Sequence, residues 1–391
     1  MRRFLSPFIL IFTTLLALMY FYAAVSLTET PAARVGLFLP FLLAWCLPVF
    51  YWGGTRETKS RWGEILHLLG FVAMGWLSFL IGFLILHDLI FILARLAGEV
   101  SFIELMSREG PPAVLGLSIL ALVLGLRSAS RGPNIRYIDI PFANLKKDLE
   151  GYTIVQISDL HIGPTIGRKY VEKVVHKTLN LAPDLIALTG DIVDGSVKDL
   201  ADAAEPLKKL GETGRAYFAM GNHDYYSGAT AWTAKFREMG LKVLLNSHVV
   251  IKKDEAKILV AGVVDPAVKM IDATSSPDPS MAIRSQDLLA QSTAKAPADF
   301  RLLLAHNPKI AADAAKVGFD LQISGHTHGG QFFPWTLVVR WVHRPHHLGR
   351  SLSGKMQVYV SAGTGSWGPP VRLGTQTELT VIRLRNEISR S

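Results

Sequence analysis

Hydrophobic residues are concentrated in the first third of the chain, where they form four long runs separated by short polar segments. The runs lie at residues 4–27, 35–52, 67–93 and 112–126. A helix of about 20 apolar residues spans the hydrocarbon core of a bilayer; the first and third runs reach this length and the other two approach it. We therefore predict a helical transmembrane region of about four spans within residues 1–130. A signal peptide is the alternative for the first run, but the run is long and no small-residue cleavage site follows it.

Beyond residue 130 the pattern changes to short apolar runs that alternate with longer segments of helical periodicity. We expect a linker and lead-in at 131–150, a domain at 151–386 and a tail at 387–391. Helical periodicity occurs near 168–179, 201–210 and 230–239, between runs such as TIVQIS, DLIALTG, AYFAMG, FRLLLAH and DLQISG. Apolar strands that alternate with helices indicate an α/β fold with a buried, largely parallel sheet. The strand-rich second half predicts a second sheet packed on the first.

Composition and charge narrow the class of protein further. The chain has 391 residues, of which 49% are hydrophobic, and a formal net charge of +9. Its mean hydropathy of +0.28 is high for a soluble enzyme. No basic stripe with interleaved aromatic residues is present, so the charge favours anionic lipid headgroups or a phosphorylated substrate and argues against nucleic acid. The single cysteine, Cys46, lies in a predicted span, which excludes an internal disulfide.

Basic residues between the runs predict the orientation in the membrane. One side of the membrane would carry Arg2, Arg3, Arg56, Lys59, Arg61, Arg127, Arg131 and Arg136, and the other side only Arg34, Arg95 and Arg108. The positive-inside rule then places both termini, and the domain after residue 150, in the cytoplasm. We therefore predict a multi-pass protein of the cell or inner membrane with a cytoplasmic domain.

Polar residues that suit metal binding follow five of the predicted strands. In chain order they are Asp159 and His161, then Asp191, then Asn222, His223 and Asp224, then His306, and finally His326 and His328. In open α/β sheets, sites form at the carboxyl ends of the strands, so these side chains are expected to meet. Each alone also fits a plain structural role, such as a helix cap or a turn residue. Carboxylate, amide and imidazole donors without any thiolate suit Mn, Fe or Zn, and argue against a closed structural zinc site.

This ordered set resembles the calcineurin-like metallophosphoesterases, whose pattern reads Asp-x-His, Gly-Asp, Gly-Asn-His-Asp or Glu, His and Gly-His-x-His. The resemblance covers about residues 152–384. The ending YVSAGTGSWGPPVRLGTQTELTVIRL resembles the membrane-associated branch of that superfamily, which includes multi-span proteins with a C-terminal phosphoesterase domain. The resemblance implies two packed, mixed β-sheets flanked by helices, preceded by the transmembrane region.

The resemblance also implies two divalent metal ions and a role for each site residue. Asp159, His161 and His328 would bind one ion, Asn222, His306 and His326 the other, and Asp191 would bridge them. A hydroxide bridging the ions would attack phosphorus in line with the leaving alkoxide. His223 would stabilise phosphoryl charge or protonate the leaving oxygen. Asp224 would orient His223, or alternatively cap the helix that follows.

These roles favour a membrane-anchored hydrolase that cleaves a phosphomonoester, phosphodiester or pyrophosphate bond. The membrane location favours a phosphorylated amphiphile as the substrate, such as a lipid or a lipid-linked sugar or nucleotide. One alternative is a catalytically weak metal-binding scaffold; another is a regulatory domain coupled to a transmembrane sensor or transporter. The complete ligand set and His223 favour the hydrolase, and the runs lack the conspicuous buried charges typical of a transport path.

The basic segment RWVHRPHHLGR, residues 340–350, follows the last metal-binding motif. Arg340, Arg344 and Arg350 are expected to contact a phosphate of an anionic lipid substrate, since arginine offers bidentate contacts to phosphate. Trp341 is expected to enter the headgroup region. The alternative is a solvated basic loop.

Overall fold

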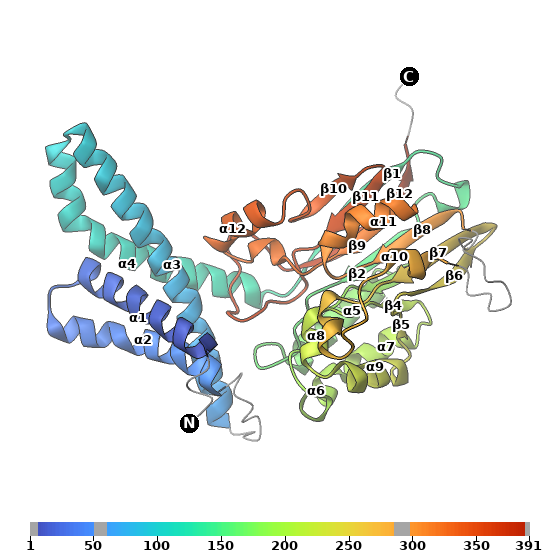
Figure 1. Cartoon of the computed structure of the whole chain (residues 1–391), viewed down its shortest axis with the longest axis horizontal. Helices are drawn as coiled ribbons and strands as arrows, with labels where there is room; N and C mark the ends of the chain where they lie inside the picture. The colour runs from blue at the N-terminus through green and yellow to red at the C-terminus, as the bar shows by residue number, and fades with distance from the viewer. Residues whose placement is uncertain (1–6, 51–60, 285–297, 388–391) are drawn as a thin grey trace. The chain divides into compact units, whose positions relative to one another are not determined.

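The structure is a computed structural model that describes residues 7–50, 61–284 and 298–387 (Figure 1). The chain divides into two compact units. The helical unit comprises the chain up to Ser130 together with two short later segments, Phe332–Trp335 and Gly368–Gly374. The sheet unit comprises residues 131–331, 336–367 and those from 375 onward.

The helical unit contains four helices that are long and apolar enough to cross a membrane. They are α1 (Pro7–Leu27), α2 (Pro31–Phe50), α3 (Arg61–Ala97) and α4 (Val100–Ser130). The predicted set of four apolar helices is thus confirmed, although α3 and α4 extend well beyond the predicted runs because their polar ends continue the helix. Residues 4–6 and 51–52 of the predicted runs, and Arg2, Arg3, Arg56 and Lys59 of the charge pattern, lie outside the described residues.

Small polar contacts and apolar packing join the helices of this unit. The indole N–H of Trp45 donates to the hydroxyl of Thr13 at 2.8 Å, and the indole N–H of Trp76 donates to Ser118 at 2.9 Å. A buried apolar cluster combines residues of α1, α2, α3 and α4. A second cluster brings Phe332 and Val371, from the two later segments, against Phe79 and Ala121. These segments are therefore part of the helical core, although they lie in the C-terminal half of the sequence.

The sheet unit contains two six-stranded sheets of mixed direction, as the resemblance implies. The first has the order β1-β12-β2-β3-β4-β5, with β1 (Asn134–Phe142), β12 (Glu378–Asn386), β2 (Thr153–Ile157), β3 (Leu185–Leu188), β4 (Ala216–Phe218) and β5 (Lys242–Val243). The second has the order β10-β11-β9-β8-β7-β6, with β10 (Gly349–Ser353), β11 (Met356–Val360), β9 (Leu321–Ser324), β8 (Phe300–Leu304), β7 (Ala256–Gly262) and β6 (Ser247–Lys253). Strands β2, β3, β4 and β5 are mutually parallel, as are β7, β8, β9 and β11.

Three apolar layers hold this unit together. The middle layer lies between the sheets and combines residues such as Ile154 and Leu185 of the first sheet with Val260 and Leu302 of the second. The outer face of the first sheet is covered by α5 (Arg168–Asn180), α6 (Val197–Ala204), α7 (Lys208–Gly211), α8 (Asn222–Tyr226) and α9 (Ala229–Glu238). The outer face of the second sheet is covered by α10 (Pro279–Ile283) and α11 (Ala311–Val317). Each fully buried leucine or isoleucine contributes about 1.5–3 kcal/mol relative to exposure. Figure 1 shows the helices on the outer faces of both sheets.

The segment 131–150, expected as a linker and domain entry, contains the strand β1. Strand β1 lies at the edge of the first sheet and pairs in parallel with β12 over its whole length. Most of its side chains are exposed or half-buried, so the segment lacks the apolar run by which the buried strands were recognised. Asp139 of β1 accepts from the guanidinium of Arg383 on β12 at 2.7 Å. Pairing with a long partner strand thus stabilises a polar edge strand that local sequence does not reveal.

Candidate metal centre

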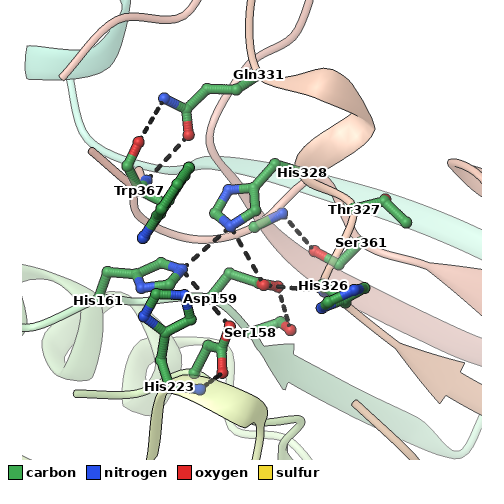
Figure 2. Close-up of polar contacts among 12 residues, drawn as sticks. Ser158, Asp159, His161, His223, His326, Thr327, His328, Gln331, Ser361 and Trp367 are labelled. Carbon is green, nitrogen blue, oxygen red and sulfur yellow. Dashed lines mark hydrogen bonds and ion pairs between the residues drawn. The ribbon is translucent and has the colours of Figure 1, made fainter. Parts of the chain in front are cut away.

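The candidate site lies where the parallel strands of both sheets end. Asp159 and His161 follow β2, Asp191 follows β3, and Asn222 and His223 begin α8 directly after β4. From the second sheet, His306 follows β8, and His326 and His328 follow β9. The structure therefore brings together at one edge the side chains that the sequence distributes over five strands. Figure 2 shows Asp159, His161, His223, His326 and His328 of this set.

The backbone at these strand ends adopts a conformation that non-glycine residues rarely occupy. The φ angles of Asp159, His161, Asp191, His326 and His328 lie between 51° and 71°. Such left-handed residues carry a conformational cost and concentrate at functional sites. Each turn directs its carboxylate or imidazole back over the end of the sheet, where a regular strand would direct it to one face.

Two glycines allow the loops to approach one another at this edge. A Cβ at Gly325 would collide with the Ser158 hydroxyl and the Asp159 carboxylate. A Cβ at Gly221 would collide with the carboxylate of Asp191. These glycines are therefore required for close approach, although neither has a positive φ.

The first ligand cluster consists of Asp159, His161 and His328, all of which are buried. The Nε2 atoms of the two histidines are 3.1 Å apart, and Nε2 of His328 lies 3.3 Å from Oδ1 of Asp159. The other oxygen of Asp159 accepts from the Ser158 hydroxyl at 2.5 Å. Two imidazole nitrogens and a carboxylate oxygen that converge in this way offer one cation three ligands.

The second ligand cluster consists of Asp191, His306 and His326, with Asn222 beside them. The amide oxygen of Asn222 lies 3.0 Å from Nδ1 of His326 and 3.2 Å from Nε2 of His306. The other ring nitrogen of His306 donates to the carbonyl of Thr189 at 2.8 Å. That hydrogen bond fixes the ring and directs Nε2 toward the cluster.

Asp191 lies between the two clusters. Its Oδ2 atom is 3.1 Å from Nε2 of His306 and 3.9 Å from Nε2 of His161. Its Oδ1 atom accepts from the backbone N–H of His223 at 2.8 Å, which fixes the carboxylate plane. One carboxylate oxygen thus faces imidazoles of both clusters.

Asp194, a residue that the sequence reasoning missed, connects His161 and His223. Its carboxylate lies 3.1 Å from Nδ1 of His161 and 2.8 Å from Nδ1 of His223. In both histidines this leaves Nε2 as the second ring nitrogen, and in His161 that atom points into the first ligand cluster. The side chain of His223 remains 22% exposed, so it is accessible to a substrate. The sequence contained one signal for this residue, its position three residues after Asp191 at the same strand end.

Asp224 does not contact the ring of His223, contrary to the expectation that it would orient that residue. Its buried carboxylate accepts from four backbone amides, those of Gly221, Asp191, Ile192 and Val193, at 2.8–3.2 Å. The alternative role as a cap is the one observed, because the amides at the start of α8 and in the turn after β3 need an acceptor. Asp224 thus positions the turn that carries Asp191.

Burial and neighbouring charges shift the pKa values of these groups in opposite directions. Burial lowers the pKa of His223, but the hydrogen bond to Asp194 and the charge of Asp191 outweigh it and raise the value to about 9. Burial and the charge of His306 lower the pKa of His326 to about 3, which leaves a neutral imidazole. Burial raises the pKa of Asp159, and the nearby charge of Asp191 adds to the shift. A cation would stabilise these buried carboxylates, and the neutral imidazole of His326 can bind one, so the residues present fit a metal centre.

Trp367 lies beside His223 and is held there by Gln331. The ring of Trp367 is 5.7 Å from that of His223, in an edge-to-face arrangement. The side-chain amide of Gln331 donates to the carbonyl of Trp367 at 3.0 Å and accepts from its N–H at 2.9 Å (Figure 2). These two hydrogen bonds join the loop that contains Trp367 to the turn that carries His328.

The three arginines expected to bind substrate are exposed, and none of them belongs to a ligand cluster. Arg340 lies in α12 (Trp335–Val342), Arg344 follows that helix, and Arg350 lies in β10. In the same segment, the ring centre of His343 is 6.0 Å from that of His326.

Comparison with known proteins identifies similar metallophosphoesterases. The model of the calcineurin-like phosphoesterase family matches residues 152–330. The Danio rerio protein named "Transmembrane protein with metallophosphoesterase domain" is 33% identical over 340 residues, which cover 84% of this chain and 75% of that protein. The Campylobacter jejuni protein named "Uncharacterized metallophosphoesterase Cj0846" is 32% identical over 70% of this chain and 69% of its own length. The solved structure of the calcineurin-like phosphoesterase YfkN from Bacillus subtilis is 15% identical with a TM-score of 0.38, and covers 58% of this chain and 89% of that one.

Proposed function

Since the chain belongs to the calcineurin-like phosphoesterase family and is a membrane protein with a metal-dependent phosphoester hydrolase domain, we propose that it uses two divalent cations to act on a lipid or lipid-linked substrate. The bond cleaved is a phosphomonoester, a phosphodiester or a pyrophosphate.

The position of Asp191 carries the proposal of two ions. Its Oδ2 atom is within 4 Å of an imidazole nitrogen of each ligand cluster. Asp159, His161 and His328 would hold one ion, and Asn222, His306 and His326 the other, with Asp191 shared. The oxygen and nitrogen donors suit Mn, Fe or Zn. When bound, the ions supply Lewis acidity toward the phosphoryl oxygens and toward the attacking water.

The chain itself supplies the proton for the leaving group. His223 holds a proton at neutral pH because Asp194 accepts a hydrogen bond from its Nδ1 atom. Its second ring nitrogen then donates to the leaving oxygen as the bond to phosphorus breaks. A positioned general acid of this kind contributes about a hundredfold to ten-thousandfold in rate.

The membrane-spanning region supports an amphiphilic substrate. A catalytic domain that is covalently attached to four apolar helices is held near lipid headgroups at all times. Arg340, Arg344 and Arg350, all exposed, offer bidentate contacts to a phosphate. The excess of basic residues on one side of the spans supports a cytoplasmic position of the domain.

Metal analysis and hydrolysis assays on the purified full chain test the number of ions. The chain in nanodiscs is depleted with a chelator and reloaded with Mn²⁺, Fe²⁺ or Zn²⁺, and elemental analysis is compared with turnover of a chromogenic phosphodiester. We expect two ions per chain and turnover that follows the second ion. Full turnover with a single ion bound would contradict the proposal.

A matched pair of substrates tests the lipid proposal. Replacing Arg340, Arg344 and Arg350 together with Ser is expected to raise KM for an anionic phospholipid in vesicles, because each basic residue contributes about 1 kcal/mol near an anionic surface. Turnover of a small soluble phosphodiester is the reference. Equal loss on both substrates would indicate damage to folding or metal geometry, and no loss on either would support a merely solvated loop.

A further inference from the structure

Helix α12, which follows the metal-binding turn, presents an unusual apolar surface. None of its residues is buried. Leu337, Val338, Trp341 and Val342 are 60%, 45%, 78% and 50% exposed, and we call these four residues the apolar face of α12. At 100° per residue they occupy one side of the helix, whereas Thr336 and Arg340 lie on the other side. Contiguous exposed apolar residues of this kind mark an interaction surface.

Three contacts attach α12 and the loop after it to the metal-binding turn. The backbone N–H of His343 donates to the carbonyl of Val339 at 2.9 Å and so continues the helix, and its ring packs 6.0 Å from that of His326. The hydroxyl of Thr327 donates to the carbonyl of His347 at 2.6 Å. The side chain of Leu348 packs against Gly329.

The contact with His326 lies on the side of α12 away from its apolar face. In helical projection, His343 is roughly opposite the centre of the arc formed by the four apolar residues. The side of the helix that carries His343 therefore faces the candidate metal centre, and the apolar face of α12 remains exposed. Trp335, its first residue, belongs to the helical unit.

The composition of the surface indicates which partner it fits. Trp341 is the most exposed residue of the apolar face, and tryptophan is enriched at the level of lipid headgroups. Arg340, Arg344 and Arg350 lie on and beside the helix and are exposed, which complements anionic headgroups. A bilayer is a permanent neighbour of this chain, because four of its helices are long and apolar enough to span one.

We propose that α12 lies in the plane of the membrane, with its apolar face in the boundary between headgroups and acyl chains of an anionic bilayer. The helix would hold the turn with His326 and His328 at the membrane surface. A substrate would then present its phosphate to the site without leaving the bilayer. This last step rests on the proposed function, whereas the insertion of α12 does not.

Site-directed fluorescence on the full chain in nanodiscs tests the insertion directly. In a Cys46→Ser background, single cysteines replace Leu337, Trp341 or Lys355, and each is labelled with a polarity-sensitive nitrobenzoxadiazole dye. Lys355 is exposed in the turn between β10 and β11 and serves as the aqueous control. The nanodiscs contain phosphatidylcholine and phosphatidylglycerol, with or without doxyl-labelled lipid.

We expect blue-shifted emission and quenching by the doxyl lipid at positions 337 and 341, and neither at 355. Water-like emission at 337 and 341 would overturn the proposal. Blue-shifted emission without quenching would also overturn it, because a second copy of the chain or another protein would then cover the helix.

Hydrolysis assays separate this inference from the proposed function. The variant Leu337→Asp, at a residue that is 60% exposed on α12, is compared with Leu352→Asp, which introduces the same charge at a leucine that is 59% exposed on β10. We expect KM for phosphatidylglycerol vesicles to rise at least about tenfold in the first variant only, with unchanged turnover of a soluble phosphodiester in both. Equal effects of the two variants on the vesicle substrate would contradict the role of α12. Absence of hydrolysis of any substrate by the wild-type chain, with insertion intact, would instead refute the proposed function alone.

Discussion

The helical unit and the sheet unit depart from the usual distribution of residues in opposite ways. In the helical unit, leucines such as Leu93 and Leu96 are exposed, the latter by 81%. In the sheet unit, charged residues are buried at the strand ends, where Asp159 is fully inaccessible and Asp191 nearly so. In water, exposed apolar surface and buried charge both cost free energy. Each arrangement therefore indicates a partner that stabilises it. The partner is a bilayer in the first case and a cation in the second.

The largest effect is expected when the carboxylate that faces both ligand clusters is removed. Asp191→Ala should abolish at least one equivalent of metal and lower turnover by more than about a hundredfold, since metal ions contribute several kcal/mol to transition-state stabilisation. Elemental analysis and phosphodiester hydrolysis measure both effects, with Asp313→Ala on the exposed surface of α11 as the control. Retention of two ions in the variant would contradict the role of Asp191.

A second test separates proton transfer from metal binding. His223→Ala should lower kcat by about a hundredfold to ten-thousandfold for substrates with poor leaving groups, and less for p-nitrophenyl esters. Metal content should stay unchanged, because the imidazole of His223 forms its ion pair with Asp194 and packs on the ring of His161 without belonging to either ligand cluster. His176→Ala, an exposed histidine on α5, is the control. Loss of metal from the His223 variant would show that it is a ligand.

A leucine-to-aspartate substitution in each unit tests whether the exposed leucines of the helical unit face lipid. Leu120→Asp in α4, at a residue 51% exposed, should destabilise the chain in nanodiscs by about 2.5–3.5 kcal/mol, as expected for a charge at the centre of a span. Leu352→Asp in β10 is similarly exposed and should change stability by less than about 0.5 kcal/mol. Thermal unfolding of both variants gives the comparison. Equal effects would mean that Leu120 does not face lipid.

Close packing at the strand ends is tested with a single methyl group. Gly325→Ala should cost about 1–3 kcal/mol and weaken metal binding, because the new Cβ collides with Ser158 and Asp159. Gly167→Ala meets open space in an ordinary backbone conformation and should have little effect. Denaturant unfolding and metal titration measure the difference. If Gly325→Ala changed neither stability nor metal binding, the loops would not be in close contact.

The smallest expected effect is on the pH profile. His223 donates a proton only while protonated, so its raised pKa keeps activity up to about pH 9 and activity falls above it. Asp194→Asn removes the charge that accepts the hydrogen bond from His223, and should move this alkaline limb toward lower pH by about one unit. The rate at pH 6 should change less than the rate at pH 8. An unmoved limb would exclude His223 as the titrating acid.

Much of the architecture was predictable from the sequence because it depends on local patterns. The four apolar helices follow from run length, and β2, β3, β4, β8 and β9 follow from short apolar runs between turns. Strand β1 was not predictable, since its polar residues become a strand only through pairing with β12. Helix α12 was not predicted either, because its apolar residues lie within a segment dominated by arginines and histidines.

The sequence by itself determined which side chains stand at the strand ends, because parallel strands that pair in register bring their carboxyl ends to one edge. It did not determine which hydrogen-bond partners those side chains have. Only the tertiary structure decided that Asp194 accepts from His223, and that Asp224 instead binds four backbone amides. Both aspartates follow a metal-binding motif closely, and the difference depends on side-chain direction at turns with left-handed residues. Such directions are set by contacts between loops that are distant in sequence, and no local pattern records them.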